Sequence, residues 1–144
     1  MIPFIIYLTI FLYLIYIIWI SEPLFLNKKL SSIKEYPYVS IIISARNESN
    51  NINQLLKCLN QQTYPNNKFE IIIANDKSTD DTLEKLTTLQ KEIKNLKIIN
   101  IKKTKNNWSS KKWALNKCIE KARGEIILQT DADCSHPETW VESM

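Results

Sequence analysis

Two carboxylates separated by a single residue, Asp131 and Asp133, follow a strand-length apolar run that begins at Ile126. In an extended chain, residues i and i+2 point to the same side, so both carboxylates can converge on one cation. Hard divalent cations such as Mg²⁺ and Mn²⁺ prefer oxygen ligands of this kind and commonly share them with a phosphate. Acidic pairs are also common at strand ends and in loops that bind no metal. The meaning of this pair therefore depends on what the rest of the chain places around it.

Two further polar clusters follow apolar runs earlier in the chain, at residues 44–48 and 75–81. Asp76 could accept hydrogen bonds from a nucleotide base or a ribose, or it could cap the helix that follows. Glu48 has the same two interpretations. Both residues are candidates for ligand binding and for local structure alike.

The segment before the carboxylate pair is basic, with eight basic residues and one acid between residues 102 and 123. Such a run is commonly only a solvated face. Alternatively Lys111 or Lys112, close to a helix start, helps to neutralise a diphosphate. His136 is predicted to be a solvated residue at a helix start rather than a ligand.

Apolar β-branched runs alternate with segments whose leucines and isoleucines repeat at helical spacing. The runs predict buried strands at residues 38–43, 69–74, 96–101 and 126–129. The repeats predict helices around residues 52–59, 83–93 and 114–122. We therefore predict an α/β fold, a mainly parallel sheet with helices on both faces, because this alternation is typical of such sheets. Ligands bind these sheets at the carboxyl ends of the strands, where all three polar clusters fall.

Local signals near the end of the chain make three further predictions. The third helix should turn Ala114, Cys118 and Ile119, among others, towards the sheet. Gly124 stands where a left-handed residue commonly ends a helix. Residues 135–138, Ser-His-Pro-Glu, form a capping-box pattern that predicts the start of another helix.

Residues 1–20 contain no charged side chain. At about 1.5 Å per residue, a helix of this length spans the roughly 30 Å of a bilayer core. A cleaved signal peptide would need a basic start, a shorter apolar region and a small-residue cleavage site, and this segment has none of them. A buried core helix is the remaining alternative. The segment is predicted to be a membrane anchor.

Lysines at positions 28, 29 and 34 follow the apolar segment. By the positive-inside rule, they hold the following domain in the cytoplasm. We predict a single-pass membrane protein with a transmembrane helix at residues 1–21, a juxtamembrane linker at 22–37 and a cytoplasmic domain at 38–144.

Composition excludes several classes of protein. A formal net charge of +4 is mild, so charge indicates no nucleic-acid partner. Gly124 is the only glycine, which excludes a P-loop and a G-x-G-x-x-G dinucleotide site. Cys58, Cys118 and Cys134 show no C-x-x-C spacing, which argues against a disulfide framework and a structural zinc site.

Taken together, the polar clusters resemble the motifs of the family 2 glycosyltransferases in order and spacing. The matching segments are Val39–Glu48, Asn75–Thr82, Lys111–Asn116 and Asp131–Asp133. The resemblance implies a GT-A fold, whose nucleotide-binding half is Rossmann-like. It also implies a nucleotide-diphosphate sugar as donor, most simply a UDP-sugar, and many family members carry a membrane anchor before this domain.

The resemblance implies a role for particular residues. Ala45 and Glu48 would line the nucleoside, Asp76 would contact the base, and Lys111 would lie near the nucleotide. Asp131 and Asp133 match the D-x-D pair of the family, which implies a divalent cofactor, Mn²⁺ or Mg²⁺. Asp133 would be the more direct metal ligand, and Asp131 would also contact the nucleotide sugar. Four positions depart from the family pattern, with Arg46 for a frequent tyrosine, Asn75 for aspartate, and Lys77 and Ser110 for glycines.

The implied reaction is a single in-line displacement in which a base deprotonates an acceptor hydroxyl and the metal stabilises the departing diphosphate. In the family this base is a carboxylate well beyond the D-x-D pair, so the resemblance places it beyond Met144. The chain is therefore interpreted as the N-terminal part of a membrane-anchored glycosyltransferase, with an unidentified acceptor. The alternative is a non-catalytic membrane-tethered module that binds a nucleotide or a partner.

Overall fold

The computed structural model describes residues 2–25 and 35–144, in two compact units that divide after residue 34. The first unit is a single helix, α1 (Ile2–Phe25), so the helix continues beyond residue 21. Large apolar side chains are exposed along its length between Phe4 and Ile20. The window Phe4–Ser21 has a mean hydropathy of 2.3 and is not buried inside the structure, so this helix is long and apolar enough to cross a membrane. The lysines at 28, 29 and 34 lie outside the described residues.

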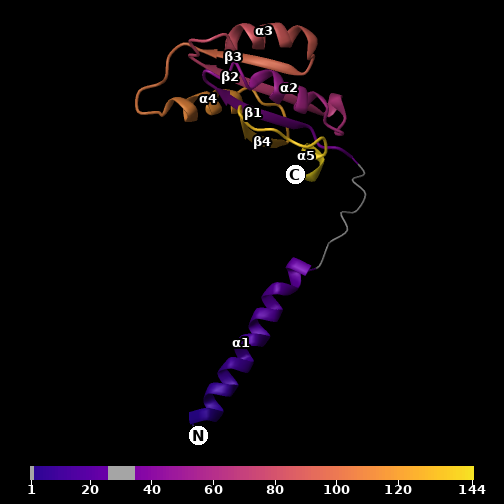
Figure 1. Ribbon diagram of the computed structural model, residues 1–144, viewed down its shortest axis with the longest axis vertical. Helices are drawn as coiled ribbons and strands as arrows, with labels where there is room; N and C mark the ends of the chain where they lie inside the picture. Colours follow the sequence, from indigo (N-terminus) through magenta and orange to yellow (C-terminus); the bar gives the residue numbers. More distant parts are fainter. Residues whose placement is uncertain (1, 26–34) are drawn as a thin grey trace. The chain divides into compact units, whose positions relative to one another are not determined.

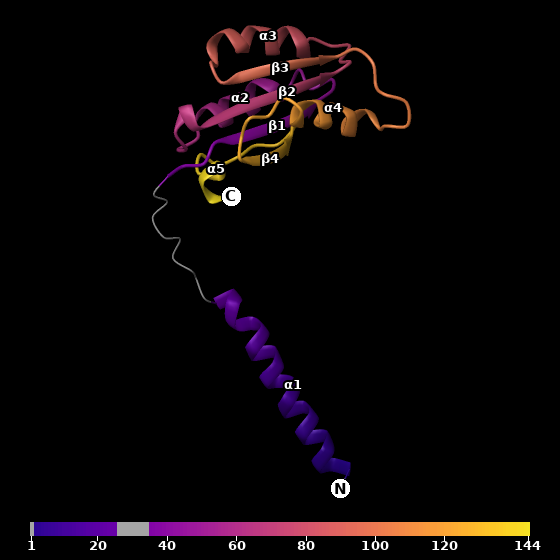
Figure 2. The same cartoon turned by 180° about the vertical axis from the view of Figure 1, so that it is seen from behind.

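The second unit is built on a parallel sheet of β1 (Val39–Ala45), β2 (Phe69–Asp76), β3 (Leu96–Ile101) and β4 (Ile126–Asp131). The strand order is β3-β2-β1-β4, and every neighbouring pair is parallel. Figures 1 and 2 show the strands side by side with helices on both faces. The predicted α/β fold is confirmed.

Helices cover the sheet on both faces. On one side lie α2 (Ile52–Asn60) and α3 (Thr82–Glu92), whose buried residues share a core with Ile41 and Ile43. On the other side α4 (Ser110–Ile119) packs Ala114 and Cys118 against Ile42. Successive strand residues thus serve opposite cores, which is why an unbroken apolar run, rather than an alternating one, builds β1. Two short elements, η1 (Asn66–Lys68) and α5 (Trp140–Ser143), complete the unit.

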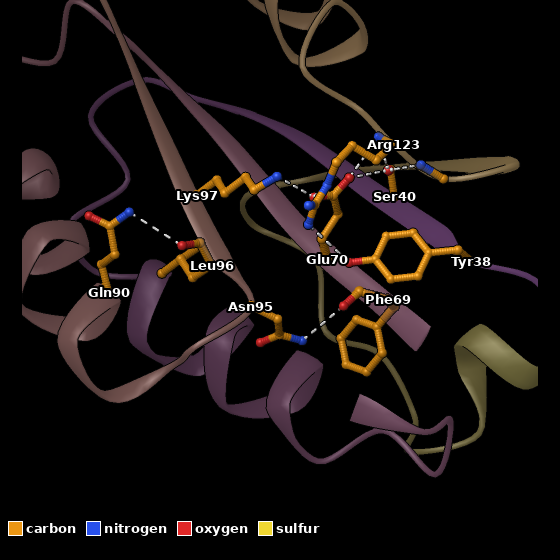
Figure 3. Close-up of polar contacts among 10 residues, drawn as sticks. Tyr38, Ser40, Phe69, Glu70, Gln90, Asn95, Leu96, Lys97 and Arg123 are labelled. Atoms are coloured by element: carbon orange, nitrogen blue, oxygen red, sulfur yellow. Dashed lines mark hydrogen bonds and ion pairs between the residues drawn. The ribbon is translucent and has the colours of Figure 1, made fainter. Parts of the chain in front are cut away.

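A buried carboxylate joins three segments at the amino-terminal end of the sheet (Figure 3). Glu70 on β2 accepts hydrogen bonds from the Ser40 hydroxyl at 2.7 Å and from the Arg123 backbone N–H at 2.7 Å. Its other oxygen lies 2.6 Å from the Lys97 ammonium. Burial raises the pKa of Glu70, but the hydrogen bonds from these donors outweigh burial and hold the pKa below its ordinary value. Glu70 therefore remains charged in the folded protein and fixes the segment that leads into β4.

Gly124 does not end a helix in the left-handed conformation, and that prediction is wrong. Helix α4 ends at Ile119, and the one glycine does not have a positive φ. Instead the Gly124 N–H donates to the Ser40 hydroxyl at 2.8 Å. A Cβ at this position would lie 2.4 Å from the Ser40 nitrogen, well inside van der Waals contact. Glycine is required here because β1 passes too close for any side chain.

Two other local predictions are also wrong. Ile119 is 49% exposed rather than buried, because it lies about 100° around the helix from Cys118, which faces the sheet. The helix predicted to start at residues 135–138 begins later, at Trp140, so its predicted position is wrong. The Pro137 carbonyl accepts from the Trp140 N–H and from the Gln62 side chain, and the Glu138 carbonyl accepts from the Thr63 N–H. These long-range bonds hold the segment against the end of α2.

Replacing Gly124 with alanine should destabilise the domain, because the new methyl group collides with the β1 backbone. We expect the free energy of unfolding to fall by about 1–3 kcal/mol, the usual range for overpacking. Urea unfolding of the full chain in detergent micelles, followed by tryptophan fluorescence, measures the change. Lys121→Ala, an exposed position nearby, is the matched control. A Gly124→Ala variant as stable as this control would contradict the close approach.

Candidate functional site

A pocket of about 340 Å³ opens at the carboxyl end of the sheet, within the usual range for ligand sites. Its walls come from the carboxyl ends of β1, β2 and β4, from the residues that follow β1 and β4, and from the start of α4. The lining residues are Ser44, Arg46, Glu48, Asp76, Ser110, Lys111, Asp131, Ala132 and Asp133. Parallel strands place these segments together, because their carboxyl ends share one edge of the sheet.

The carboxylate pair lies at the point where β4 ends. Asp131 is the last residue of the strand, Ala132 turns inward and is buried, and Asp133 is exposed in the pocket. The two carboxylates supply the hard oxygen ligands that Mn²⁺ and Mg²⁺ prefer. No cluster of three or more potential metal ligands occurs among the described residues. A cation held by this pair would therefore need further oxygen ligands from outside these side chains.

Lys111 forms an ion pair with this carboxylate site. Its ammonium lies 2.8 Å from an Asp131 carboxylate oxygen, and both side chains are about half exposed, at 57% and 48%. The hydrogen bond to Asp131 raises the pKa of Lys111, and the nearby Asp133 charge acts in the same direction. The pocket therefore carries a positive group in direct contact with Asp131, one of its two metal-binding candidates.

Asp76 lies at the end of β2 in the wall of the pocket and is 2% exposed. The Ser110 hydroxyl donates to it at 2.8 Å, and the Lys77 ammonium lies 3.5 Å away. Lys77 also donates to the Ser110 hydroxyl at 2.8 Å and to the Thr104 hydroxyl at 2.6 Å. These bonds hold the start of α4 against the end of β2. They fix Asp76 in position with one carboxylate oxygen engaged by the protein.

Lys77 adopts a left-handed backbone conformation, with φ of 55°. Glycine is the residue that adopts this conformation without strain, which accounts for the glycine that the family often has here. In this chain a lysine bears the strain, and its ammonium forms the hydrogen bonds with Thr104 and Ser110. Sequence reasoning identified Lys77 as a departure but did not detect its contacts.

The loop that carries Glu48 is tied to the loop after β2. Asn47, with φ of 57°, accepts a hydrogen bond from the Thr79 N–H at 2.8 Å. The Glu48 N–H donates to the Thr82 hydroxyl at 2.9 Å. The Thr82 hydroxyl in turn donates to Asp80 at 2.5 Å. This hydrogen bond is the largest of several that lower the pKa of Asp80 to about 2. This network positions Glu48 at the pocket wall.

The structure brings Glu48, Asp76, Lys111, Asp131 and Asp133 together in one pocket. Ala45 is different, because its side chain is fully buried in the core beside α2 and does not line the pocket. Its neighbours Ser44 and Arg46 line it instead, as alternation along a strand requires. Ser110 was considered only as a departure from the family pattern, although its position just before Lys111 at a helix start could have indicated a role.

His136 is not the solvated residue that the sequence predicts. Its ring stacks on Trp140, with centroids 4.0 Å apart, and its Nε2 atom lies 2.6 Å from the Thr130 hydroxyl. Burial lowers its pKa, because the charged imidazolium is disfavoured away from water. His136 therefore links the segment after Asp133 to the strand that carries Asp131.

The parallel sheet, the strand-end pocket and the D-x-D pair together define a GT-A-like α/β fold. The sequence model described as glycosyl transferase family 2 matches residues 40–144, and the chain belongs to this family.

Relatives and solved structures agree with this membership. Glycosyltransferase AglE of Haloferax volcanii is 32% identical over 106 residues, covering 74% of this chain and 34% of that protein. The β-monoglucosyldiacylglycerol synthase of Nostoc sp. is 39% identical over 97 residues, covering 67% of this chain and 20% of that protein. The chain thus spans about a third or less of the length of these curated relatives.

Two solved structures share the fold. S. aureus TarS in complex with UDP has a TM-score of 0.64 at 25% identity, covering 74% of this chain and 30% of that one. The mannosyltransferase PcManGT from Pyrobaculum calidifontis, in complex with GDP-Man and Mn²⁺, has a TM-score of 0.64 at 27% identity. That match covers 72% of this chain and 30% of the mannosyltransferase.

The lowered pKa of His136 predicts a pH dependence of stability. As the pH falls from about 6.5, the unfolded chain takes up a proton on this histidine before the folded chain does, so stability should fall with pH. His136→Phe keeps an aromatic ring against Trp140 and removes the titration. Between pH 7.5 and 5.5 the wild type should lose stability more steeply, by at most about 1.4 kcal/mol per pH unit. If the curves of unfolding free energy against pH ran parallel for the wild type and His136→Phe, this prediction would be contradicted.

Proposed function

We propose that residues 38–144 bind the nucleotide-diphosphate sugar, most simply a UDP-sugar, of a metal-assisted glycosyltransferase. The observation that carries the proposal is the convergence of five polar side chains from four segments on one pocket: Glu48, Asp76, Lys111, Asp131 and Asp133. Two solved structures with the same fold, one in complex with UDP and one in complex with GDP-Man and Mn²⁺, support it.

Each group suits a different part of the donor. Asp76 has one carboxylate oxygen engaged by Ser110, and its other oxygen can accept from a base N–H or a ribose hydroxyl. Lys111 supplies a positive charge for the diphosphate. Asp131 and Asp133 would hold the divalent cation, which when bound supplies charge stabilisation for the departing diphosphate. The donor is thereby held through its nucleoside diphosphate, which is the leaving group.

The catalytic base is proposed to belong to a further part of a longer protein. Among the described pocket carboxylates, Asp76 is engaged by Ser110, Asp131 is paired with Lys111, and Asp133 is assigned to the metal. Glu48 accepts from the Asn51 side chain at 2.7 Å and is assigned to the nucleoside. The curated relatives, about three or more times as long as the matched segment, support this division.

Titration of the full chain in detergent micelles with UDP and Mn²⁺ tests donor binding. We expect UDP to bind, and Asp133→Asn to weaken the Mn²⁺-dependent part about tenfold or more, because changes around a metal site commonly cost 10- to 100-fold. Asp81→Asn, an exposed residue outside the pocket, is the matched control and should bind as the wild type does. Equal UDP binding by Asp133→Asn and the control would contradict the metal assignment. Binding without sugar transfer by the longer protein would favour a non-catalytic module.

We also propose that α1 anchors the protein in a membrane, with the following domain in the cytoplasm. Exposed apolar side chains surround the helix between Phe4 and Ile20, and such a surface needs an apolar environment. The lysines that follow support the orientation. Two relatives named β-monoglucosyldiacylglycerol synthases, whose name includes a lipid, support a role at a membrane.

The exposed thiol of Cys134 provides a test of this topology. A membrane-impermeant maleimide should label Cys134 in inside-out membrane vesicles and not in sealed right-side-out vesicles. Cys134→Ser controls for labelling of the other cysteines, and resistance of the protein to alkaline carbonate extraction tests insertion. Labelling in right-side-out vesicles would overturn the orientation, and release by carbonate would overturn the anchor.

A further inference from the structure

The ion pair between Lys111 and Asp131 places a cation of the protein on a carboxylate assigned to a metal. The two groups are 2.8 Å apart, and the same pocket contains Asp133. A carboxylate oxygen that binds an ammonium at this distance has that lone pair occupied. A divalent cation that approaches Asp131 must therefore compete with the ammonium, both for the oxygen and through charge repulsion.

Lys111 occupies an unfavourable place for helix stability alone. It is the second residue of α4, whose first turn contains no acidic residue. The amino-terminal end of a helix carries partial positive charge, so a carboxylate stabilises it and an ammonium does not. Asp131, from β4, compensates this charge across the pocket. A residue that breaks a local rule and is balanced by a functional carboxylate indicates a role in the site.

The pair is also easily displaced. Both side chains are about half exposed, and ion pairs at this level of exposure are weak because water screens them. A bound diphosphate offers the ammonium a new partner of higher charge. The same diphosphate offers the metal the oxygen ligands that the described residues lack, since no cluster of three potential metal ligands occurs among them.

We propose that Lys111 is a resident counter-ion that competes with the divalent metal for Asp131 and transfers to the diphosphate when the donor binds. Metal and nucleotide diphosphate consequently bind with positive cooperativity, because breaking the Lys111–Asp131 pair once benefits both ligands. This inference rests on the proposed function, and it adds a regulation of the same site. Lys111 acts as a positioning residue for the donor and as a brake on metal binding without it.

This inference is tested by titrating the full chain in detergent micelles with Mn²⁺, with and without UDP. The electron paramagnetic resonance signal of free Mn²⁺ measures the binding. Lys111→Met should tighten Mn²⁺ binding in the absence of UDP by about three- to tenfold, as expected for removal of a half-exposed competing charge. UDP should then improve Mn²⁺ binding by a smaller factor in Lys111→Met than in the wild type. Lys111→Arg keeps the charge and should behave as the wild type.

Lys112→Met is the matched control. It also removes one positive charge, but the Lys112 side chain, one residue further along, does not line the pocket. It should leave Mn²⁺ affinity within about twofold of the wild type, since exposed charges without direct contact are screened. Circular dichroism verifies that each variant is folded. Unchanged or weaker Mn²⁺ binding by folded Lys111→Met would overturn the inference while leaving the proposed function intact. Absence of Mn²⁺ binding in every form, with or without UDP, would overturn both.

Discussion

The pairing of β1 with a parallel strand on each side is the constraint on which the rest of the domain depends. β1 pairs with β2 from Val39↔Phe69 to Ala45↔Asn75 and with β4 from Val39↔Ile126 to Ser44↔Asp131. Because the strands are parallel and in this register, three polar loops leave the sheet at one edge. A slip of one residue would turn every side chain to the opposite face, so both cores and the position of Asp131 depend on the same register.

The opposite end of the sheet contains the contacts that hold this register. Glu70 is buried and charged, and its oxygens accept from Ser40 on β1, Lys97 on β3 and the Arg123 backbone. A buried carboxylate without such partners would be strongly destabilising, so the segment before β4 is held where its N–H groups can reach Glu70 and Ser40. Gly124 permits that approach because a side chain would collide with β1. The start of β4 and, through it, the carboxylate pair at its end are positioned by this cluster.

The pocket at the carboxyl edge combines negative groups with cations that the chain itself supplies. Lys77 bonds to Ser110 beside Asp76, and Lys111 is paired with Asp131. The two lysines differ in how firmly they are held. Lys77 is held by the hydroxyls of Thr104 and Ser110, which suits a structural role, whereas Lys111 is half exposed in a single ion pair and free to exchange partners. Lys111 thus lines the pocket as a half-exposed ion-pair partner, and Lys77 is held behind Asp76.

The sequence alone determined the α/β fold, because continuous isoleucine runs and helical repeats report local periodicity and burial. It also identified Glu48, Asp76, Asp131 and Asp133 as site candidates, since parallel topology sends strand ends to one edge, and Lys111 from its place near a helix start. The tertiary structure alone decided the contact of Gly124 with Ser40, the stacking of His136 on Trp140 and the hydrogen bonds of Lys77 with Thr104 and Ser110. Each of these contacts depends on how separate segments pack. Neither residue type nor spacing along the chain directly encodes the distance between such segments in the folded protein.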